Sequence, residues 1–139
     1  MFALTSKICE TRLKTGWTAS AASTVSIRWP NVPWKQPTSG EWISFHLIPG
    51  DGEQASLGSQ KLERQYGLVV VQVFTPKNTG ARRALDLADI VGSLFRYRTE
   101  IDSGVSVIFR APMMADVAER ADQYQTNVKI EYQAEKVFS

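Results

Sequence analysis

The sequence is poor in the residues that most catalytic and metal sites require. It has one cysteine, Cys9, and one histidine, His46, among 139 residues. A single cysteine excludes an internal disulfide and a cysteine-based zinc site, and it fits a reducing cytosol. With one histidine, most metal centres and acid–base sites lack ligands. We therefore expect no catalytic residue, no metal and no cofactor in this chain.

Long hydrophobic runs and a strong excess of either charge are also missing. The longest strongly apolar run, 68–71, is far too short to span a bilayer. Lys7 and Glu10 interrupt the amino-terminal segment before the apolar part of a signal peptide could form. Sixteen basic against fourteen acidic residues leave a net charge of +2, too small to predict nucleic-acid binding. Any partner has to be inferred from other features.

The composition that remains is typical of a globular domain. Apolar residues make up 43% of the chain, charged residues 22% and aromatic residues 10%. These proportions exclude disordered, collagen-like and coiled-coil classes. A chain of this mass can bury about two thirds of its extended surface. We expect a single domain over residues 1–139 whose core needs no disulfide or metal.

Helical spacing of apolar residues predicts two main helices. The first covers 2–14 and places Cys9 on its core-facing side, as a small buried hydrophobe. The second covers about 80–97 and should pack across a sheet. The segment 113–123 is ambiguous, because its Ala, Glu, Arg and Asp residues favour a helix over only about ten residues.

Alternating apolar and polar residues predict strands over 24–29, 41–48, 60–75 and 124–133, and a hairpin of 99–101 with 105–111. Three prolines in 30–40 indicate a structured surface loop, and three glycines in 49–59 indicate a long loop. The order of elements predicts an α+β fold, with a mixed and mostly antiparallel sheet of about five strands packed by two main helices.

The strand predicted over 60–75 is unusually long. At about 3.3 Å per residue it would reach roughly 50 Å, two to three times the usual length. Its first half, 61–65, is polar, so we expect it to project beyond the sheet as part of an extended β-arm over about 49–66. An extended arm cannot bury its own faces, so docking on a neighbouring molecule is its natural role.

The few patterns that could carry chemistry are weak. Residues 50–55 match the G-x-G-x-x-A spelling of a dinucleotide-binding turn, but no helix is expected after them, and their two carboxylates would repel phosphate. His46 faces away from the apolar side of its strand and is expected to be solvated or at an interface. Asp86 and Asp89 lie one helical turn apart, yet nearby arginines make them ordinary surface charge pairs.

Tryptophans gather around the proline-rich loop, at positions 29, 34 and 42. They could stack on single-stranded bases or sugar rings, with Lys35 nearby for phosphate. One lysine supplies little positive charge for binding a nucleic acid. Core packing beneath the loop, or a subunit interface in which Trp is favoured, is therefore the better interpretation.

Several motifs together resemble the small tail terminator proteins of long-tailed bacteriophages. The likeness runs over about residues 25–98, whereas 113–123 is longer and more helical than the usual loop of that family. The motifs are Trp29-Pro-Asn-Val-Pro-Trp34, Gly40-Glu-Trp-Ile43, Gly52-Glu-Gln-Ala-Ser-Leu-Gly58, Tyr66-Gly67 leading to Val73-Phe-Thr-Pro76, and Gly80 opening an Ala/Leu/Asp helix that ends in Leu94-Phe95.

The resemblance implies a non-enzymatic subunit that assembles as a ring, commonly a hexamer, on the last ring of the tail tube. There it would stop tube polymerisation and offer a surface to the head–tail connector or neck protein. The implied location is the neck end of the virion tail, after assembly in the host cytoplasm. Neither a membrane nor a specific nucleic acid is implied as a partner, although genome DNA can pass through such a ring.

Two groups of residues are then predicted to contact the next subunit or the tail tube. Trp34 and Trp42 would anchor one interface. The arm would supply the other through Asp51, Glu53, Gln54, Ser56, Leu57, Lys61 and Arg64.

Two alternatives stay open. A neck or head-completion protein of the same virion would share the size, the lack of catalysis and the ring symmetry. A single-stranded nucleic-acid-binding module would instead show an affinity for an oligonucleotide that falls steeply with salt. We expect no such binding at physiological salt.

Overall fold

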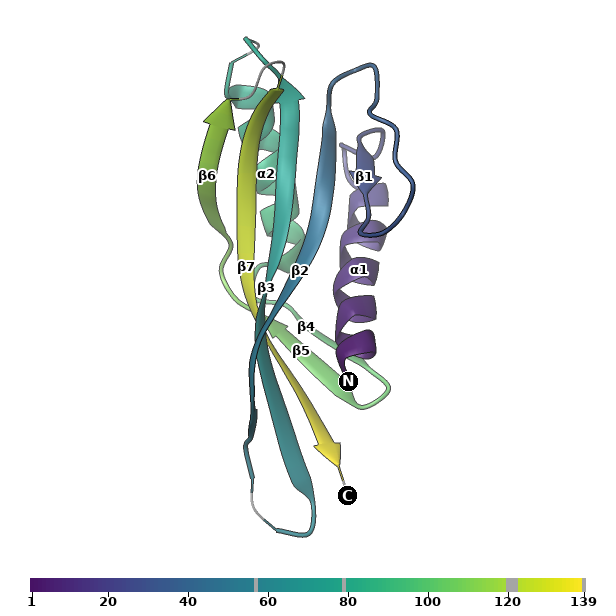
Figure 1. The fold of residues 1–139 in the computed structure, drawn as a ribbon, viewed down its shortest axis with the longest axis vertical. Coiled ribbons are helices and arrows are strands. Elements are labelled where there is room, and N and C mark those ends of the chain that lie inside the picture. Colours follow the sequence, from purple (N-terminus) through teal and green to yellow (C-terminus); the bar gives the residue numbers. More distant parts are fainter. Residues whose placement is uncertain (57, 79, 120–122, 139) are drawn as a thin grey trace.

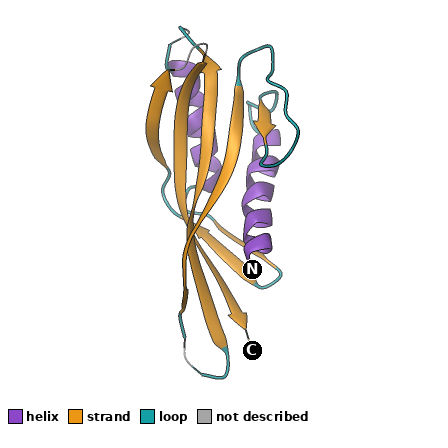
Figure 2. Ribbon diagram, in the orientation of Figure 1, coloured by secondary structure: helices purple, strands orange, loops and turns teal. Residues whose placement is uncertain are grey.

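The fold is α+β, as predicted, and consists of two helices on one face of a curled seven-stranded sheet (Figure 1, Figure 2). The computed structural model describes residues 1–56, 58–78, 80–119 and 123–138. The helices are α1 (Phe2–Thr18) and α2 (Arg82–Phe95). The strands are β1 (Ser26–Arg28), β2 (Trp42–Gln54), β3 (Lys61–Pro76), β4 (Thr99–Asp102), β5 (Val105–Phe109), β6 (Met113–Glu119) and β7 (Gln123–Phe138).

The sheet is mixed and mostly antiparallel. Its strand order is β1-β2-β3-β7-β5-β4, and β6 pairs with β7 outside this path. The pair β1–β2 is parallel and the other five pairs are antiparallel. One edge of β7 is divided between two partners, because its first half pairs with β6 and its second half with β5.

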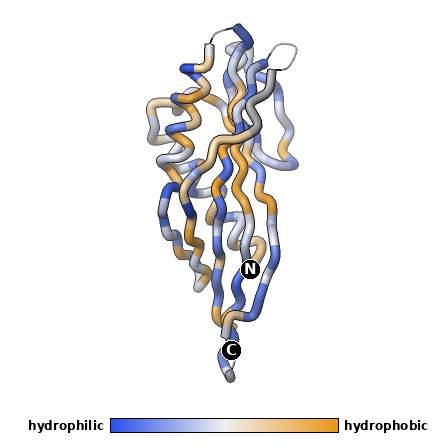
Figure 3. The backbone as a smooth tube through the Cα atoms, turned by 90° about the vertical axis from the view of Figure 1, so that its left-hand side faces the viewer, coloured by the Kyte–Doolittle hydropathy of each residue, from blue (hydrophilic) through white to orange (hydrophobic). Residues whose placement is uncertain are grey.

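The core lies between the helices and one face of the sheet. Side chains alternate along a strand, and the register places Phe45, Val71 and Val128 of the three central strands side by side on this face. All three are buried. Hydrophobic (orange) stretches run along the helices and the central strands of this part of the molecule (Figure 3). The ring of Phe95 in α2 meets that of Phe109 in β5 edge-on, with centroids 5.0 Å apart.

The two helices confirm the sequence prediction, although α1 continues to Thr18 where the pattern predicted 2–14. Arg12 of α1 donates a hydrogen bond from Nε to the carbonyl oxygen of Leu94, at 2.7 Å. This contact places a cation at the carboxyl-terminal turn of α2, where the helix dipole favours it. Burial, followed by the nearby charge of Arg98, lowers the pKa of Arg12.

The segment 113–123 forms a strand, β6, through Glu119, where the composition favoured a short helix. Residues 120–122 lie outside the described residues. Helix propensity is a weak prior, and without β6 the edge of β7 over 124–129 would have no strand partner. β6 covers this edge, with a register shift between Ala115 and Ala118. The sheet therefore has seven strands where about five were predicted.

The prediction of a loop over 49–59 is wrong for the first half of that segment. Residues through Gln54 continue β2, and they pair with β3 as far as Gln54 opposite Glu63. A register shift between Pro49 and Gly52 marks a β-bulge, which increases the local twist. Below the point where the strands cross in Figure 1, the β2–β3 hairpin and the end of β7 project away from the helices as an arm.

Candidate assembly surfaces

The second face of the sheet, turned away from the core and the two helices, is called here the open face. It is formed by the alternate side chains of the central strands. Cross-strand rows on this face run from Trp42 to Phe74, from Ser44 to Gln72 and from Ile48 to Leu68. Between these apolar end rows lie the polar row Ser44–Gln72 and the mixed row His46–Val70. A sheet face of this kind suits contact with another protein more than catalysis.

Aromatic rings line up where β2 begins. Trp42 stacks on Phe74, with centroids 4.6 Å apart and ring planes 14° apart. Trp34, in the loop before β2, lies 6.3 Å from Trp42 with a 48° tilt. Trp42 is only 6% exposed, and Trp34 is half-buried. Trp42 is therefore committed to packing within its own chain, while Trp34 keeps part of its surface in solvent.

The motif that precedes Trp42 fixes this aromatic cluster to α2. Arg83 donates from Nε to Glu41 Oε2 at 2.8 Å and from a terminal nitrogen to Oε1 at 3.3 Å. This pairing raises the pKa of Arg83. Gly40 has a φ of +74°, and a Cβ there would lie 3.1 Å from the Pro76 ring. A glycine is needed at this position, which explains the order Gly40-Glu41-Trp42.

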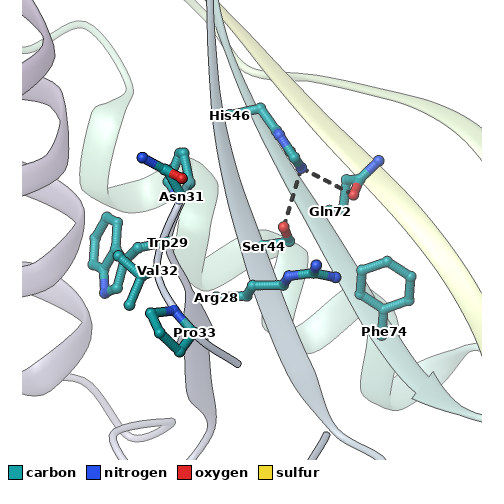
Figure 4. Close-up of a pocket in the computed structure, with 10 residues that line it drawn as sticks. Arg28, Trp29, Asn31, Val32, Pro33, Ser44, His46, Gln72 and Phe74 are labelled. Atoms are coloured by element: carbon teal, nitrogen blue, oxygen red, sulfur yellow. Dashed lines mark hydrogen bonds between the residues drawn. The ribbon is translucent and has the colours of Figure 1, made fainter. Parts of the chain in front are cut away.

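A pocket of about 620 Å³ lies between the proline-rich loop and the open face (Figure 4). On its sheet side, His46 Nε2 lies 3.0 Å from Ser44 Oγ and 3.2 Å from Gln72 Oε1. Arg28 brings a positive charge, and no carboxylate is among the lining residues. These are Arg28, Trp29, Pro30, Asn31, Val32, Pro33, Ser44, His46, Gln72 and Phe74.

The surroundings of His46 therefore offer it two neutral partners and no acidic one. Among the residues that the structure describes, no group of three or more His, Cys, Asp or Glu side chains is placed to hold a metal ion. No helix in the described ranges is long and apolar enough to cross a membrane.

A row of charged side chains, called here the brace, connects the three strands of the arm. Glu53, Arg64 and Glu135 lie opposite one another on β2, β3 and β7. Arg64 donates from Nε to Glu135 Oε1 at 2.6 Å and from a terminal nitrogen to Glu53 Oε1 at 3.4 Å. Tyr66 donates its hydroxyl to the same Glu53 oxygen at 2.9 Å. Glu53 and Arg64, both predicted to contact a neighbour, thus already hold the arm's own strands together.

Polar contacts also shape the tip of the arm. Gln54 Nε2 donates to the carbonyl oxygen of Ser56 at 2.7 Å. The Leu62 N–H donates to Ser56 Oγ at 2.9 Å, and the Ala55 N–H donates to the Leu62 carbonyl at 2.6 Å. Ser56 therefore closes the turn in the way that serine side chains commonly do.

The residues predicted to make interfaces fall into two separate surfaces. Trp34 and Trp42 lie near the beginning of β2, whereas the arm residues lie around its end, at the other end of the molecule (Figure 1). Asp51 and Lys61 are exposed on the arm. Leu57 lies outside the described residues.

Sequence analysis missed two residues that shape these surfaces. Glu135 lies beyond the predicted end of the last strand at 133, although the same alternation continues and places it on the Arg64 side of the sheet. Arg28 ends β1 and borders the pocket, and no local pattern distinguishes it from other exposed arginines. Extending the alternation past 133 was the one available signal.

The brace predicts a pH-dependent arm. Because Arg64 donates to Glu135, the pKa of Glu135 lies below its ordinary value of 4.5. A carboxylate of this kind stabilises the folded state above its ordinary pKa, and the contribution is lost as the pH falls through the lowered value. We expect Glu135→Gln to reduce amide protection in 61–66 and 133–138 at pH 7. The further loss of protection that the wild-type protein shows below pH 4.5 should be smaller in this variant. Hydrogen exchange with mass spectrometry measures this, using 69–73 as an internal control. Identical pH profiles for the two proteins would contradict the prediction.

Comparison with known proteins gives one family and one fold. A family model described as phage tail terminator protein matches residues 6–132, which confirms the resemblance found in the motifs. No curated protein sequence matches the chain. One solved structure, 18% identical in sequence, superposes with a TM-score of 0.77 and covers 96% of this chain and 95% of that chain. That likeness shows a shared fold.

Proposed function

This chain belongs to the phage tail terminator protein family, and on that premise we propose that it forms a ring that caps the tail tube. The ring stops tube polymerisation and provides the surface for joining to the head connector. Family membership itself gives the chain a structural role in the phage tail, among other tail or head components. The proposal adds a hexameric ring to this role, with the subunit located at the neck end of the tail.

The observation that carries the proposal is the arm. Three strands leave the body together, and each arm strand exposes side chains that the monomer does not bury. Val137 is 53% exposed and Phe138 38% exposed at its end. The brace holds the strands of this extension together. Such internal bracing is expected of a segment that docks on a partner. Docking of the arm on the last ring of the tube accounts for its length, its order and its exposed apolar side chains.

We propose that the protein acts without catalysing a reaction. The surroundings of the two side chains best suited to catalysis, His46 and Cys9, support this proposal. His46 is held by two neutral groups, and Cys9 is fully buried. A protein of this kind works by presenting a surface of fixed shape to copies of itself and to a tubular polymer.

A phage with a nonsense codon in this gene tests the proposal. We expect tubes of uncontrolled length and filled heads without attached tails, seen by electron microscopy. Adding purified protein to isolated tubes should restore their capacity to join heads. Tails of normal length beside defective heads would indicate a head-completion protein instead. Normal, correctly joined particles would refute both assignments.

A further inference from the structure

Among the strand edges that lack a strand partner within the described residues, two lie on opposite sides of the central strands. On one side, β1 pairs with β2 over Trp42–Ser44 and leaves Phe45–Ile48 without a strand partner, while Trp29 of the following loop packs against the ring of Phe45. On the other side, β6 pairs with β7 by one edge, and its second edge is open. None of the loop backbone hydrogen bonds in the described part of the chain reaches either edge. Figure 1 shows the two edges on opposite sides of the upper sheet.

The open part of β2 ends where the strand becomes protected. Pro49 lacks an N–H donor, the bulge between Pro49 and Gly52 twists the edge, and Asp51 and Glu53 add negative charge. These are the devices by which edge strands avoid pairing with other chains. Residues 45–48 carry none of them. The edge is thus closed to a partner strand in the arm and open to one in the body.

We propose that the open edge of β6 in one copy pairs with residues 45–48 of β2 in the next copy, so that the sheet continues around the ring. Strand direction favours this contact. β2 runs antiparallel to β3, β3 to β7, and β7 to β6, so β6 runs opposite to β2. In a ring whose axis runs roughly along the strands, every copy keeps this direction. β6 then meets the next β2 as an antiparallel pair, and the head-to-tail contact closes by rotation.

The surroundings of the open part of β2 carry positive charge. The open part of β2 is bordered by Arg28, which ends β1, and by a pocket whose lining includes no carboxylate.

Exposed apolar side chains also match across the two edges. Met113 is 47% exposed on β6 and Ile48 is 51% exposed on β2, and both lie on the open-face side of their strands. Pairing the edges would remove this apolar surface from water. The inference rests on the proposed function, because it names the contact that builds the ring. It assigns ring closure to the body and leaves the arm for the tube.

Cysteine cross-linking tests the contact, because the chain's own thiol, Cys9, is not expected to react. Cys9 is fully buried, and burial, reinforced by the charge of Glu10, raises its pKa to about 12. A thiol in this state does not react at neutral pH. Any disulfide between copies must then come from introduced cysteines.

The informative variants combine Ile48→Cys with Met113→Cys or with Ala115→Cys, since all three positions share the open-face side of their strands. After oxidation, at least one double variant is expected to give a ladder of covalent multimers on a denaturing gel. Each single variant should run as a monomer on the same gel, because identical residues do not meet in a head-to-tail contact. Ile48→Cys combined with Leu85→Cys, on the exposed side of α2, is the matched control and should give no ladder.

A charge on the edge provides the second measurement. Ile48→Lys is expected to weaken self-association by on the order of tenfold or more in sedimentation experiments, with an unchanged circular dichroism spectrum. Leu85→Lys adds the same charge at a similarly exposed position and should leave association unchanged. If the protein is monomeric in solution, the cross-linking is performed on assembled tails.

The outcomes separate the two proposals. Unchanged association of Ile48→Lys, with no ladder in solution or in tails, overturns the edge contact and leaves the tail-capping role standing. Dimers from the single variant Ile48→Cys would also overturn it, because they indicate a two-fold contact. Normal tails in the phage that lacks the chain overturn the capping role, whatever the cross-links show.

Discussion

Gly67→Ala is expected to destabilise the protein by about 2–3 kcal/mol and to lower its Tm by roughly 8–12 °C. A Cβ at this position would overlap the Cζ and Oη atoms of Tyr132, which lies directly opposite on β7. The tyrosine ring covers the glycine backbone, an arrangement that compensates for the missing side chain in a strand. Tyr132 is only 3% exposed, and burial raises its pKa to about 12. A shift of this largely buried ring away from a new Cβ is expected to disturb its packing.

Thermal and urea unfolding measure this effect, and Gly52→Ala is the matched control. A Cβ at Gly52 would lie 3.6 Å from the Arg64 carbonyl oxygen, an ordinary contact, so the expected change is within about 0.5 kcal/mol. Combining Gly67→Ala with Tyr132→Leu should cost less than the sum of the two single changes, because the overlap is removed. Equal losses for Gly67→Ala and Gly52→Ala would show that the tyrosine does not decide the stability of this site.

The position of Gly67 connects stability to function. It lies opposite Pro49 on one side and Tyr132 on the other, next to the bulge that turns β2 into the arm. A side chain here would change the strand spacing at the point where the arm leaves the body. The direction of the arm therefore depends on one small residue, and a variant that folds at low temperature should still be impaired in tail capping.

The elements that sequence analysis predicted correctly are those with strong local signals. α2 has a clear apolar stripe, and all six residues of that stripe are buried: Ala84, Leu87, Ala88, Val91, Leu94 and Phe95. The hairpin β4–β5 follows from Asp102-Ser103-Gly104, where Ser103 and Gly104 have positive φ values of 51° and 84°. Each of these signals lies within a few residues of the structure that it specifies.

The errors have one physical cause, which is pairing between distant strands. Pro49, Gly50 and Gly52 indicate a break in the chain, and the structure has a break there, in the form of a bulge. Pairing with β3 nevertheless continues the strand beyond it. In 113–119, the unpaired edge of β7 outweighs a weak preference for helix. Local composition contains no information about either partner.

The same limit applies to the candidate interfaces. Sequence analysis identified Arg64 as a contact residue because it is charged and lies in a projecting segment. Its closest partner is Glu135, 71 residues further along the chain, and this pairing depends on the full register of β3 against β7. Trp42 is similar, since its burial depends on stacking against Phe74. The sequence indicates which residues are suited to contacts, and the register decides which contacts are made within the chain.

Replacing residues 56–61 by Asn-Gly is expected to abolish control of tail length while leaving the fold intact. An Asn-Gly pair closes a two-residue hairpin between Ala55 and Leu62, whose backbone hydrogen bond is retained. The pair Gln54–Glu63 and the charged brace behind it are also unchanged. The variant thus loses only the tip of the arm. If the tip docks on the tube, the tails should become as overlong, and the plaque titre as low, as in the phage that lacks the chain.

The tip replacement also separates the two roles that the sequence predicts for the arm. With ring closure assigned to β6 and β2, light scattering should give the wild-type oligomer mass, and electron microscopy should show overlong, unjoined tubes. A lower mass would instead make the arm a contact between subunits. A six-residue Gly-Ser segment at 56–61 keeps the length and changes the chemistry, so restored tail length in that control would mean that reach alone matters. Normal tails from the shortened variant would exclude the tip of the arm from tube recognition, because the rest of the arm is unchanged in that variant.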